Sequence, residues 1–567
     1  MVSLRDHCEQ RLAGLKALRT DYEGEWQAIA RFAQPARSRF LSGARNNGGK
    51  RRAQNSRLLD PQGIEAFRTL TNGMMSGLTS SSRPWFKLRL TDPELNEQAG
   101  ARAWLGQVET ALYHFLARTN FYSAAKAGYA EMGLFGTEAC VMVDHPQQGA
   151  VCHSLTAGEY WIALSDAMVP DTLIRIAPMS ARQAVQAFGE KAPRSARAAL
   201  DSGDGERLVE IHQLIEPDPD YDADNPARID IKPWRSIYWH AESGRDAVIR
   251  VAGYEEQPFW APRWDVVGGD TWGVSPGMEA LPALRELQMQ VKRRNEAIDQ
   301  MVRPEKVVKP GLRLTGEPGR TVSAAGFDRD SVLIPYPMPY QAVAVIGEEI
   351  EKCRQQIDSL SFAGLFNAIT NMRGIQPRNM EEIAARNEEK LTQLGPVIEN
   401  VTREKLSIAI ERAYGIMARG QMLPPPPESI AGQAIDVEFV SILTQMQRAV
   451  GVDQIERTVA FIGGLAGAMP EVIDKLDSDE LVDEFASRAG VPGAIIRGAA
   501  DVEAVRAERA AAQQQAQMAQ AMQQMGGLIG GGSDPAAADE AGSEAGAEAE
   551  AAAGNGGVEF LQAMGLA

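Results

Sequence analysis

The chain has 567 residues, too many for one ordinary hydrophobic core, and we expect two to four structural regions. Its 44% hydrophobic content fits a soluble, helix-rich protein, and its net charge of −17 argues against binding of duplex nucleic acid over the outer surface. The charge suits a protein that lets a polyanion slide past, or it only keeps a large protein in solution.

The cysteines and the hydropathy of the chain indicate the cellular compartment in which the protein is made. The four cysteines show no pairing spacing, which indicates synthesis in a reducing, intracellular compartment. The N-terminus lacks an apolar signal core. The longest weakly polar run, Val459–Met469, is far shorter than the roughly 20 residues of a membrane span. We therefore expect no membrane association.

The first predicted element is a helix over residues 4–32, where apolar residues recur with helical spacing. From Arg31 to Leu59 the chain has eight basic residues and no acidic one. Asn46–Gly49 in its middle predicts a flexible loop, which is either solvated or in contact with an acidic partner.

The next predicted elements are a helix over 60–75, a strand over 87–90, a helix from about Trp104 and a second helix that stops near Gly136. Short β-type runs follow, at 141–143, 151–155, 160–162, 237–240 and 248–251. They lack the regular βαβ alternation of a nucleotide-binding sheet, so the sequence predicts α+β organisation.

The middle third is predicted to be helical with one interruption. A helix begins at Ser275-Pro276, a good N-cap followed by a good first residue, and Arg303-Pro304 closes it. Residues 304–345, rich in glycine and proline, predict a small non-helical insert. Helix resumes over 346–360 and breaks at 361–376.

A long helix then runs to about Arg419, kinked or interrupted by Pro396. A strand-like segment over 436–440 and further helices to about residue 524 follow. Residues 526–557 have too little apolar surface to offset the entropy of ordering, which predicts disorder. From Asp501 to the end there are ten acidic and two basic residues, so nearly half of the net charge lies there.

Motifs for catalysis are missing from the sequence. Gly43–Arg51 is similar to a phosphate-binding loop, but Arg51 follows Lys50 where that loop needs serine or threonine. The scattered residues Cys140, His145, Cys152 and His153 match no zinc-finger spacing. We expect no enzyme, no cofactor and no metal site.

Several motifs occur in a recognisable order. They are Pro84-Trp85-Phe86, the helix at Trp104, Gly136-Thr137, Trp272-Gly273 with Ser275-Pro276-Gly277, Arg303-Pro304, Leu394–Val397, Gln421–Pro424, Met469–Asp477 and Gly490–Pro492. In this order they resemble the podovirus-type portal proteins, or head-to-tail connectors, over residues 1 to about 510. The chain departs from the family at 369–376, where relatives often have a Thr-Ala-Thr-Glu-like turn.

The resemblance implies the portal fold, an α+β and mainly helical chain that assembles as a ring with an axial channel. Its parts would be a wing (1–270), stem helix 1 (271–303), a clip (304–345), stem helix 2 (346–360), a tunnel loop (361–376), a long wing helix and strand (377–441), crown or barrel helices (442–525) and a disordered acidic tail (526–567).

The resemblance also implies a structural role at one vertex of a bacteriophage capsid, within the virion, after synthesis in the bacterial host cytoplasm. A dodecameric DNA channel would serve genome packaging and DNA ejection. The implied partners are further copies of the chain, terminase, tail adaptor proteins, the major capsid or scaffolding protein and double-stranded DNA without sequence specificity.

Two sets of basic and polar residues are candidates for contacts in such a ring. Candidate channel residues are Lys292, Arg293, Arg294, Asn367, Asn371 and Arg373, although the three on the stem helix could instead pair with acids of an adjacent subunit. Candidate clip residues for partner binding are Arg313 and Arg320.

Two other functions stay open from the residues alone. One is a scaffold or adaptor of another large cytoplasmic assembly, with the acidic tail as its interaction arm. The other is a nucleic-acid enzyme with an unrecognised site. A native mass near 61.5 kDa would favour the enzyme, and an axial hole in electron micrographs would favour the portal over the scaffold.

Overall fold

The computed structural model describes residues 3–37, 58–92, 95–96, 98–222, 231–241, 248–310, 326, 328, 331–335, 337–370, 388–449, 459, 461–462, 464, 479–482, 502 and 505–514. The chain divides into two units, Met1–Val491 and Pro492–Ala567. In the second unit, the described residues 505–514 are helical. All of the named helices and strands belong to the first unit.

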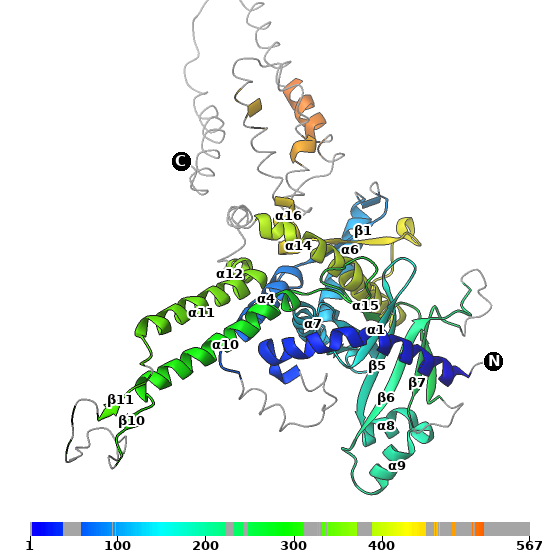
Figure 1. Cartoon of the computed structure of the whole chain (residues 1–567). Helices are drawn as coiled ribbons and strands as arrows, with labels where there is room; N and C mark the ends of the chain where they lie inside the picture. Colours follow the sequence, from blue (N-terminus) through cyan, green and yellow to red (C-terminus); the bar gives the residue numbers. More distant parts are fainter. Residues whose placement is uncertain are drawn as a thin grey trace, which may run out of the picture. The chain divides into compact units, whose positions relative to one another are not determined.

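Helices predominate in the first unit (Figure 1). The α-helices are α1 (Leu4–Ala33), α4 (Gln62–Leu78), α6 (Ala99–Arg118), α7 (Phe121–Phe135), α8 (Ala181–Phe188), α9 (Arg194–Asp201), α10 (Pro276–Val302), α11 (Tyr340–Leu360), α12 (Ala363–Thr370), α14 (Glu388–Val401), α15 (Ser407–Arg419) and α16 (Ile442–Ala449). Short 3-10 helices are η1 (Pro35–Arg37), η2 (Gly189–Lys191) and η4 (Glu428–Ile430), and η3 (Thr402–Leu406) is a π-helix between α14 and α15.

The strands form antiparallel sheets. They are β1 (Phe86–Leu90), β2 (Ala139–His145), β3 (Gly149–Leu155), β4 (Tyr160–Leu164), β5 (Pro170–Ser180), β6 (Leu208–Pro217), β7 (Trp234–Trp239), β8 (Arg250–Tyr254), β9 (Phe259–Trp260), β10 (Val307–Val308), β11 (Val332–Leu333) and β12 (Ile435–Phe439). Among the described residues the sheet orders are β4-β5-β6-β7-β8, β3-β2-β9, β1-β12 and β10-β11.

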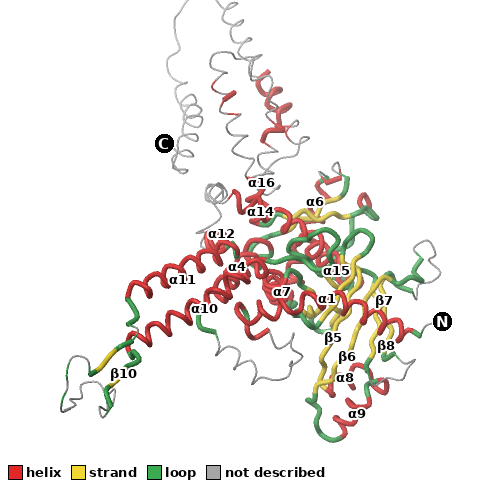
Figure 2. Tube along the Cα trace, viewed as in Figure 1, coloured by secondary structure: helices red, strands yellow, loops and turns green. Residues whose placement is uncertain are grey.

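The five-stranded sheet is covered on both faces, because successive side chains along a strand point to opposite sides. One face packs on α1, where Cys8 and Leu12 join a cluster with Ile174 of β5. The other face packs on α8 and α9 through their alanines and through Ile211 of β6 and Ile249. Figure 2 shows α8 and α9 beside these strands.

Helices α10 and α11 lie side by side, and the short sheet of β10 and β11 lies at their far ends (Figure 1). The seam between the helices is apolar, with Leu287 and Val291 of α10 and Ile350, Cys353 and Ile357 of α11 buried. The prediction of a helix that begins after Ser275 and ends before Pro304 is confirmed. We call residues 276–360 the α10–α11 hairpin.

Three predicted boundaries were wrong or incomplete. Helix α11 begins at Tyr340 rather than at 346, because the prolines that exclude helix end at Pro339 and residues 341–345 contain no helix breaker. Residues 363–370 of the predicted tunnel loop form α12, whose buried Phe366 packs against Gly73 of α4. Pro396 lies inside α14 without ending it, and the irregular segment is the π-helix at 402–406.

The predictions also missed β5, α8, α9 and β6, because short alternating and alanine-rich runs resemble loops in a long window. The basic segment begins later than predicted, since α1 extends to Ala33 and Arg37 pairs with the buried Glu131. The remainder of that segment, residues 38–57, lies outside the described residues, as do most of the predicted crown helices and the acidic tail 526–567.

Candidate functional site

Two of the motifs, Gly136-Thr137 and Trp272–Gly277, meet where the end of α7 contacts the start of α10. A Cβ at Gly136 would lie less than 3.0 Å from the carbonyl oxygen of Gly273, and a Cβ at Gly273 would lie less than 3.0 Å from the carbonyl oxygen of Gly136. A Cβ at Gly277 would meet the backbone of Leu134. Gly136 also has a φ of 79°, the left-handed conformation that favours glycine. We call this contact the α7–α10 joint.

Hydrogen bonds complete the α7–α10 joint. The Ser275 hydroxyl donates to the carbonyl oxygen of Leu134 (2.8 Å) and accepts from the backbone N–H of Met278 (3.1 Å), so it caps α10 as predicted while it holds α7. The backbone N–H of Gly273 donates to Thr137 Oγ1 (3.0 Å). The joint therefore fixes the position and direction of the first turn of α10.

Aromatic side chains support the same region. Trp272 is buried with its ring 5.0 Å from that of Trp26 and 5.6 Å from that of Tyr160. The other predicted motif forms a separate cluster: Pro84 is exposed, whereas Trp85 and Phe86 are buried. The backbone N–H groups of Trp85 and Phe86 both donate to the Tyr113 hydroxyl at 2.8 Å.

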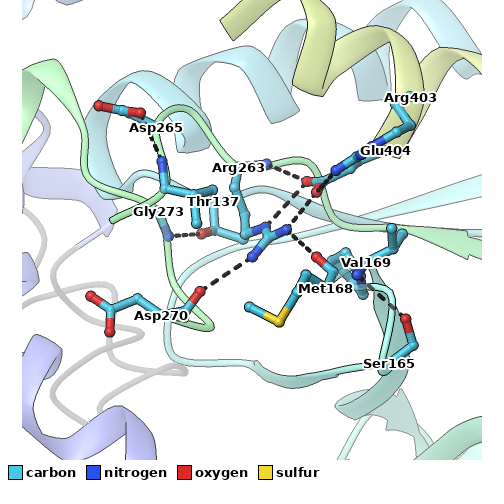
Figure 3. Close-up of polar contacts among 12 residues, drawn as sticks. Thr137, Ser165, Met168, Val169, Arg263, Asp265, Asp270, Gly273, Arg403 and Glu404 are labelled. Atoms are coloured by element: carbon cyan, nitrogen blue, oxygen red, sulfur yellow. Dashed lines mark hydrogen bonds and ion pairs between the residues drawn. The ribbon is translucent and has the colours of Figure 1, made fainter. Parts of the chain in front are cut away.

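A buried ion pair lies next to the α7–α10 joint (Figure 3). Arg263 Nη2 donates to Glu404 Oε1 at 2.6 Å, with side-chain exposures of 2% and 0%. The backbone N–H of Arg263 donates to the other Glu404 oxygen at 3.0 Å. The remaining guanidinium donors reach the carbonyl oxygens of Met168 (2.6 Å) and Asp270 (3.2 Å). Arg263 thus connects the segment before α10, the loop before β5 and the π-helix.

A second buried pair adjoins the first. Lys405 Nζ donates to Glu138 Oε2 at 2.7 Å, with both side chains 0% exposed. Trp260 Nε1 donates to the other Glu138 oxygen at 3.0 Å, and the Lys405 ammonium lies 3.7 Å from the centre of the Tyr129 ring. Burial raises the pKa of the Glu138 carboxyl, while Lys405 and Trp260 lower it. The two pairs bury two positive and two negative charges.

The π-helix explains how neighbours Glu404 and Lys405 are both buried. In an α-helix consecutive side chains are about 100° apart, so one of two neighbours usually faces away from a flat contact surface. The π-turn changes this spacing locally, and such turns are frequent at functional sites. Glu138 and Arg263, the partners, lie on adjoining segments, since the backbone N–H of Glu138 donates to Pro262 O.

Further along, α15 is tied to the same segments. Arg412 is buried and pairs with Glu256 at 2.7 Å and with Asp144 of β2. Arg419 also pairs with Glu256. Gly415 lies between them, and a Cβ there would overlap the Glu256 carboxylate. Burial raises the pKa of Glu256, but hydrogen bonds from Arg419 and Arg412 outweigh burial and bring it below the ordinary 4.5.

These groups are paired with one another, which suits a structural role. We call Glu138, Arg263, Glu404, Lys405, Arg412 and Glu256 the buried ionic row. The sequence did not predict this row, because its members lie on segments far apart in the chain. The one local signal was the adjacency of Arg403, Glu404 and Lys405, which spacing alone does not distinguish from a solvated turn.

The α10–α11 hairpin exposes many apolar side chains. Of the 21 large hydrophobic residues that are exposed among the described residues, nine lie between residues 289 and 345: Met289, Ile298, Met301, Val302, Val307, Leu333, Ile334, Tyr340 and Val345. Val302 is 72% and Tyr340 75% exposed. Exposed apolar groups concentrated in this way mark interaction surfaces.

The structure separates the three predicted basic residues of α10. Lys292 and Arg293 are exposed, and Lys292 forms a surface pair with Glu296 at 3.6 Å. Arg294 is half-buried, on the side of Val291 and Ala297, and its Nε has no hydrogen-bond partner among the described residues. Three consecutive residues span roughly 200° of a helix, so they cannot all face one channel.

The other predicted contact residues are only partly described. Asn367 is exposed on α12, whereas Asn371, Arg373, Arg313 and Arg320 lie outside the described residues. Within the non-helical insert predicted at 304–345, Val307–Val308 and Val332–Leu333 pair with each other as β10 and β11. Lys309 also pairs with Asp328 at 2.8 Å across this short sheet.

A family model described as bacteriophage head to tail connecting protein matches residues 5–496. The chain belongs to this family. The resemblance inferred from the ordered motifs is therefore confirmed, and the connector family is favoured over a scaffold of another assembly or an enzyme. None of the matched names is that of an enzyme.

Two relatives match nearly the whole connector chain. The portal protein of Salmonella phage epsilon15 is 35% identical over 522 residues, 90% of this chain and 92% of that protein. The probable portal protein of Bordetella phage BPP-1 is 34% identical over 535 residues, 93% of this chain and 94% of that protein. The connector is thus a phage portal-type protein.

Among solved structures, a chain from the neck of an empty GTA particle covers 76% of the connector and 90% of its own length, with 14% identity and a TM-score of 0.34. That score is too low for structural inference. Among the residues that the structure describes, no helix combines the length and hydropathy that a membrane-spanning segment needs.

Proposed function

We propose that the connector assembles as a dodecameric ring at one capsid vertex and that double-stranded DNA passes through its axial channel during packaging and ejection. The observation that carries this proposal is the concentration of exposed apolar residues on the α10–α11 hairpin. A second copy of the hairpin is the natural cover for them, because subunits arranged in a ring place the same element of neighbouring copies side by side.

In this proposal the body up to residue 270 is the wing, α10 and α11 are the stem helices and the connection between them is the clip. With α11 beginning at Tyr340, the clip is shorter than the sequence predicted and spans residues 303–339. Residues 371–376 are what remains of the predicted tunnel loop, residues 377–441 are the long wing helix and strand, and residues 442–525 are the crown.

The proposed channel contact is electrostatic and independent of DNA sequence. Lys292 and Arg293, exposed on α10, are the stem residues available for phosphates, whereas Arg294 belongs to the seam. Asn367, Asn371 and Arg373 would contribute from α12 and the segment after it. The net charge of −17 limits adhesion of DNA elsewhere.

The native particle tests the ring. A dodecamer has twelve times the mass of one 61.5 kDa chain, about 740 kDa, and negative-stain images should show an axial hole. Ile298→Glu with Met301→Glu places charges in the proposed interface and should prevent ring formation. Leu18→Glu with Leu208→Glu is the matched control, since these exposed apolar residues lie outside the hairpin. A monodisperse 61.5 kDa wild-type particle would contradict the ring.

The clip is proposed to dock terminase during packaging and tail adaptor proteins afterwards. Arg313→Glu with Arg320→Glu should leave rings intact and abolish binding of both partners in a pull-down on rings verified by electron microscopy. Intact double-variant rings that still bind both would remove the clip from this role. The wing and crown are proposed to contact the major capsid or scaffolding protein.

The connector is proposed to be a structural component of the virion, made in the host cytoplasm and without ATPase or nuclease activity of its own. The motor would be a separate protein, in keeping with the missing phosphate-binding motif. ATP turnover that co-purifies with the chain and disappears in Lys50→Met would overturn this assignment.

A further inference from the structure

A pocket of about 940 Å³ lies on one face of the five-stranded sheet. Its floor is formed by β5, β7 and β8, with Arg175, Tyr238, Ala252 and Tyr254 among the floor residues. One wall is the β2–β3 hairpin and the opposite wall is α8. The connector assignment gives this pocket no role, and all of its lining belongs to a single chain.

Arg175 is the distinctive group of the pocket. It is only 6% exposed, and its Nε donates to Gln213 Oε1 at 2.6 Å. Gln213 in turn donates to Ser236 Oγ at 2.8 Å, so both partners of this chain are fixed on the sheet. The two terminal nitrogens of Arg175 make no hydrogen bond or ion pair among the described residues, and they are not among the fully enclosed atoms without a partner there, so they face the pocket. A guanidinium held in place by its Nε, with its terminal nitrogens open to a pocket, can pair with a negative group.

The surrounding charges limit that group to about one negative charge. Arg250 adds a second guanidinium at the exposed rim. Two carboxylates also line the pocket. Asp144 pairs with Arg412, and Glu159 accepts a hydrogen bond from the backbone N–H of Thr156 at 3.3 Å. These carboxylates would repel a phosphate dianion more strongly than a single carboxylate. Arginine pairs with carboxylates in a planar, two-bonded geometry.

The remaining lining mixes apolar and aromatic residues with polar ones. The first group includes Leu155, Met179, Phe188, Tyr238 and Tyr254, and the second includes His145, His153, Ser154, Gln183 and Gln186. A volume near 940 Å³ lies within the range of sites for compact ligands. A DNA duplex is much larger than a cavity of about 940 Å³. An extended peptide can place an acidic side chain on Arg175 and apolar neighbours against the walls.

We propose that this pocket binds an acidic peptide segment of a partner protein, with one Asp or Glu carboxylate paired to Arg175 and apolar flanking residues against Phe188 and Tyr238. The lining of this pocket contains no residue of the α10–α11 hairpin, and the proposal is tested on the full chain.

The test uses a defined probe, acetyl-(4-fluoro-Phe)-Glu-Leu-amide, followed by fluorine NMR with the full-length protein. The matched probe carries Gln in place of Glu. We expect saturable binding of the Glu probe, and binding weaker by about tenfold or more for the Gln probe and for Arg175→Met, since hydrogen bonds to charged groups are strong. Arg250→Met should weaken binding less. Arg182→Met is the control, because Arg182 lies on α8 but outside the lining and pairs with Glu206.

Equal binding of the Glu and Gln probes, no saturable binding of the Glu probe, or unchanged binding to Arg175→Met would each overturn the proposal. Inorganic phosphate that binds while the Glu probe does not would replace it by an inorganic anion site. Displacement of the probe by a short DNA duplex would replace it by a nucleic-acid site. Should Arg175→Met melt at a much lower temperature than wild type, Arg250→Met decides: weakened binding supports the pocket, and unchanged binding overturns it.

Discussion

Replacing Glu404 by glutamine should destabilise the first unit by about 3–5 kcal/mol, because it leaves the buried charge of Arg263 without its partner. The two side chains are 0% and 2% exposed, so water cannot replace the lost carboxylate. Glutamine keeps the size of the side chain and one carbonyl acceptor. The loss therefore reports the charge rather than a cavity.

A second variant separates the pair from its parts. Replacing both Arg263 and Glu404 by methionine removes both charges together, and substitutions of whole buried pairs by apolar residues are often neutral. The double variant loses the hydrogen bonds from the Arg263 guanidinium to the carbonyl oxygens of Met168 and Asp270 and the bond from the Arg263 backbone N–H to Glu404, at about 1 kcal/mol each. The double variant should therefore be more stable than Glu404→Gln.

Urea unfolding followed by tryptophan fluorescence measures this difference, since all nine tryptophans lie in the first unit. Glu206→Gln is the matched control, because Glu206 forms a surface pair with Arg182 whose side chains are mostly exposed. Surface pairs contribute about 0–1 kcal/mol. If Glu404→Gln unfolded at the same urea concentration as Glu206→Gln, the reasoning about a dry ion pair would be refuted.

Three further outcomes are expected. Gly136→Ala should lower the free energy of unfolding by about 1–3 kcal/mol because of its left-handed backbone, and further because the new Cβ overlaps Gly273. Gly24→Ala, in open space on α1, is the control and should raise the free energy of unfolding by roughly 0.5–1 kcal/mol. Unchanged urea unfolding of Gly136→Ala would argue against the α7–α10 joint. Because folding lowers the pKa of Glu256, this carboxylate stabilises the fold above its ordinary pKa of 4.5, and the stabilisation is lost as the pH falls below that value. Glu256→Gln should therefore flatten the pH dependence of the urea midpoint. An unchanged pH dependence would contradict the pairing with Arg412 and Arg419. Removal of residues 526–567 should leave ring assembly intact, and monomers after truncation would show that the tail is structural.

Local chemistry was enough to predict the elements that position the hairpin. Ser275 and Pro276 begin α10 because their side chains suit the first turn, and Pro304 closes it because the preceding residue avoids the helical region. The strand predicted near Asp436 is β12, although its pairing with β1, some 350 residues earlier, was not visible in the sequence.

The buried ionic row and the pocket could not be predicted, because both depend on contacts between distant segments. Arg263 and Glu404 are 141 positions apart, and in the sequence neither can be distinguished from a charged residue on the surface. Arg175 lies on β5, a strand that the sequence did not predict. Its hydrogen bond to Gln213 follows only from the pairing of β5 with β6.

Three glycines among the residues that carried the family resemblance share a physical property in the structure. Gly136, Gly273 and Gly277 lie where two backbones are too close for a Cβ, and Ser275 serves both helices of the α7–α10 joint. A core position accepts another apolar side chain after small shifts, but a contact between two backbones admits only glycine. These glycines therefore mark the positions where the backbones of α7 and α10 are in contact. Those contacts determine where the α10–α11 hairpin begins and how it leaves the body. The motif that helps to identify the family therefore also orients the proposed assembly surface.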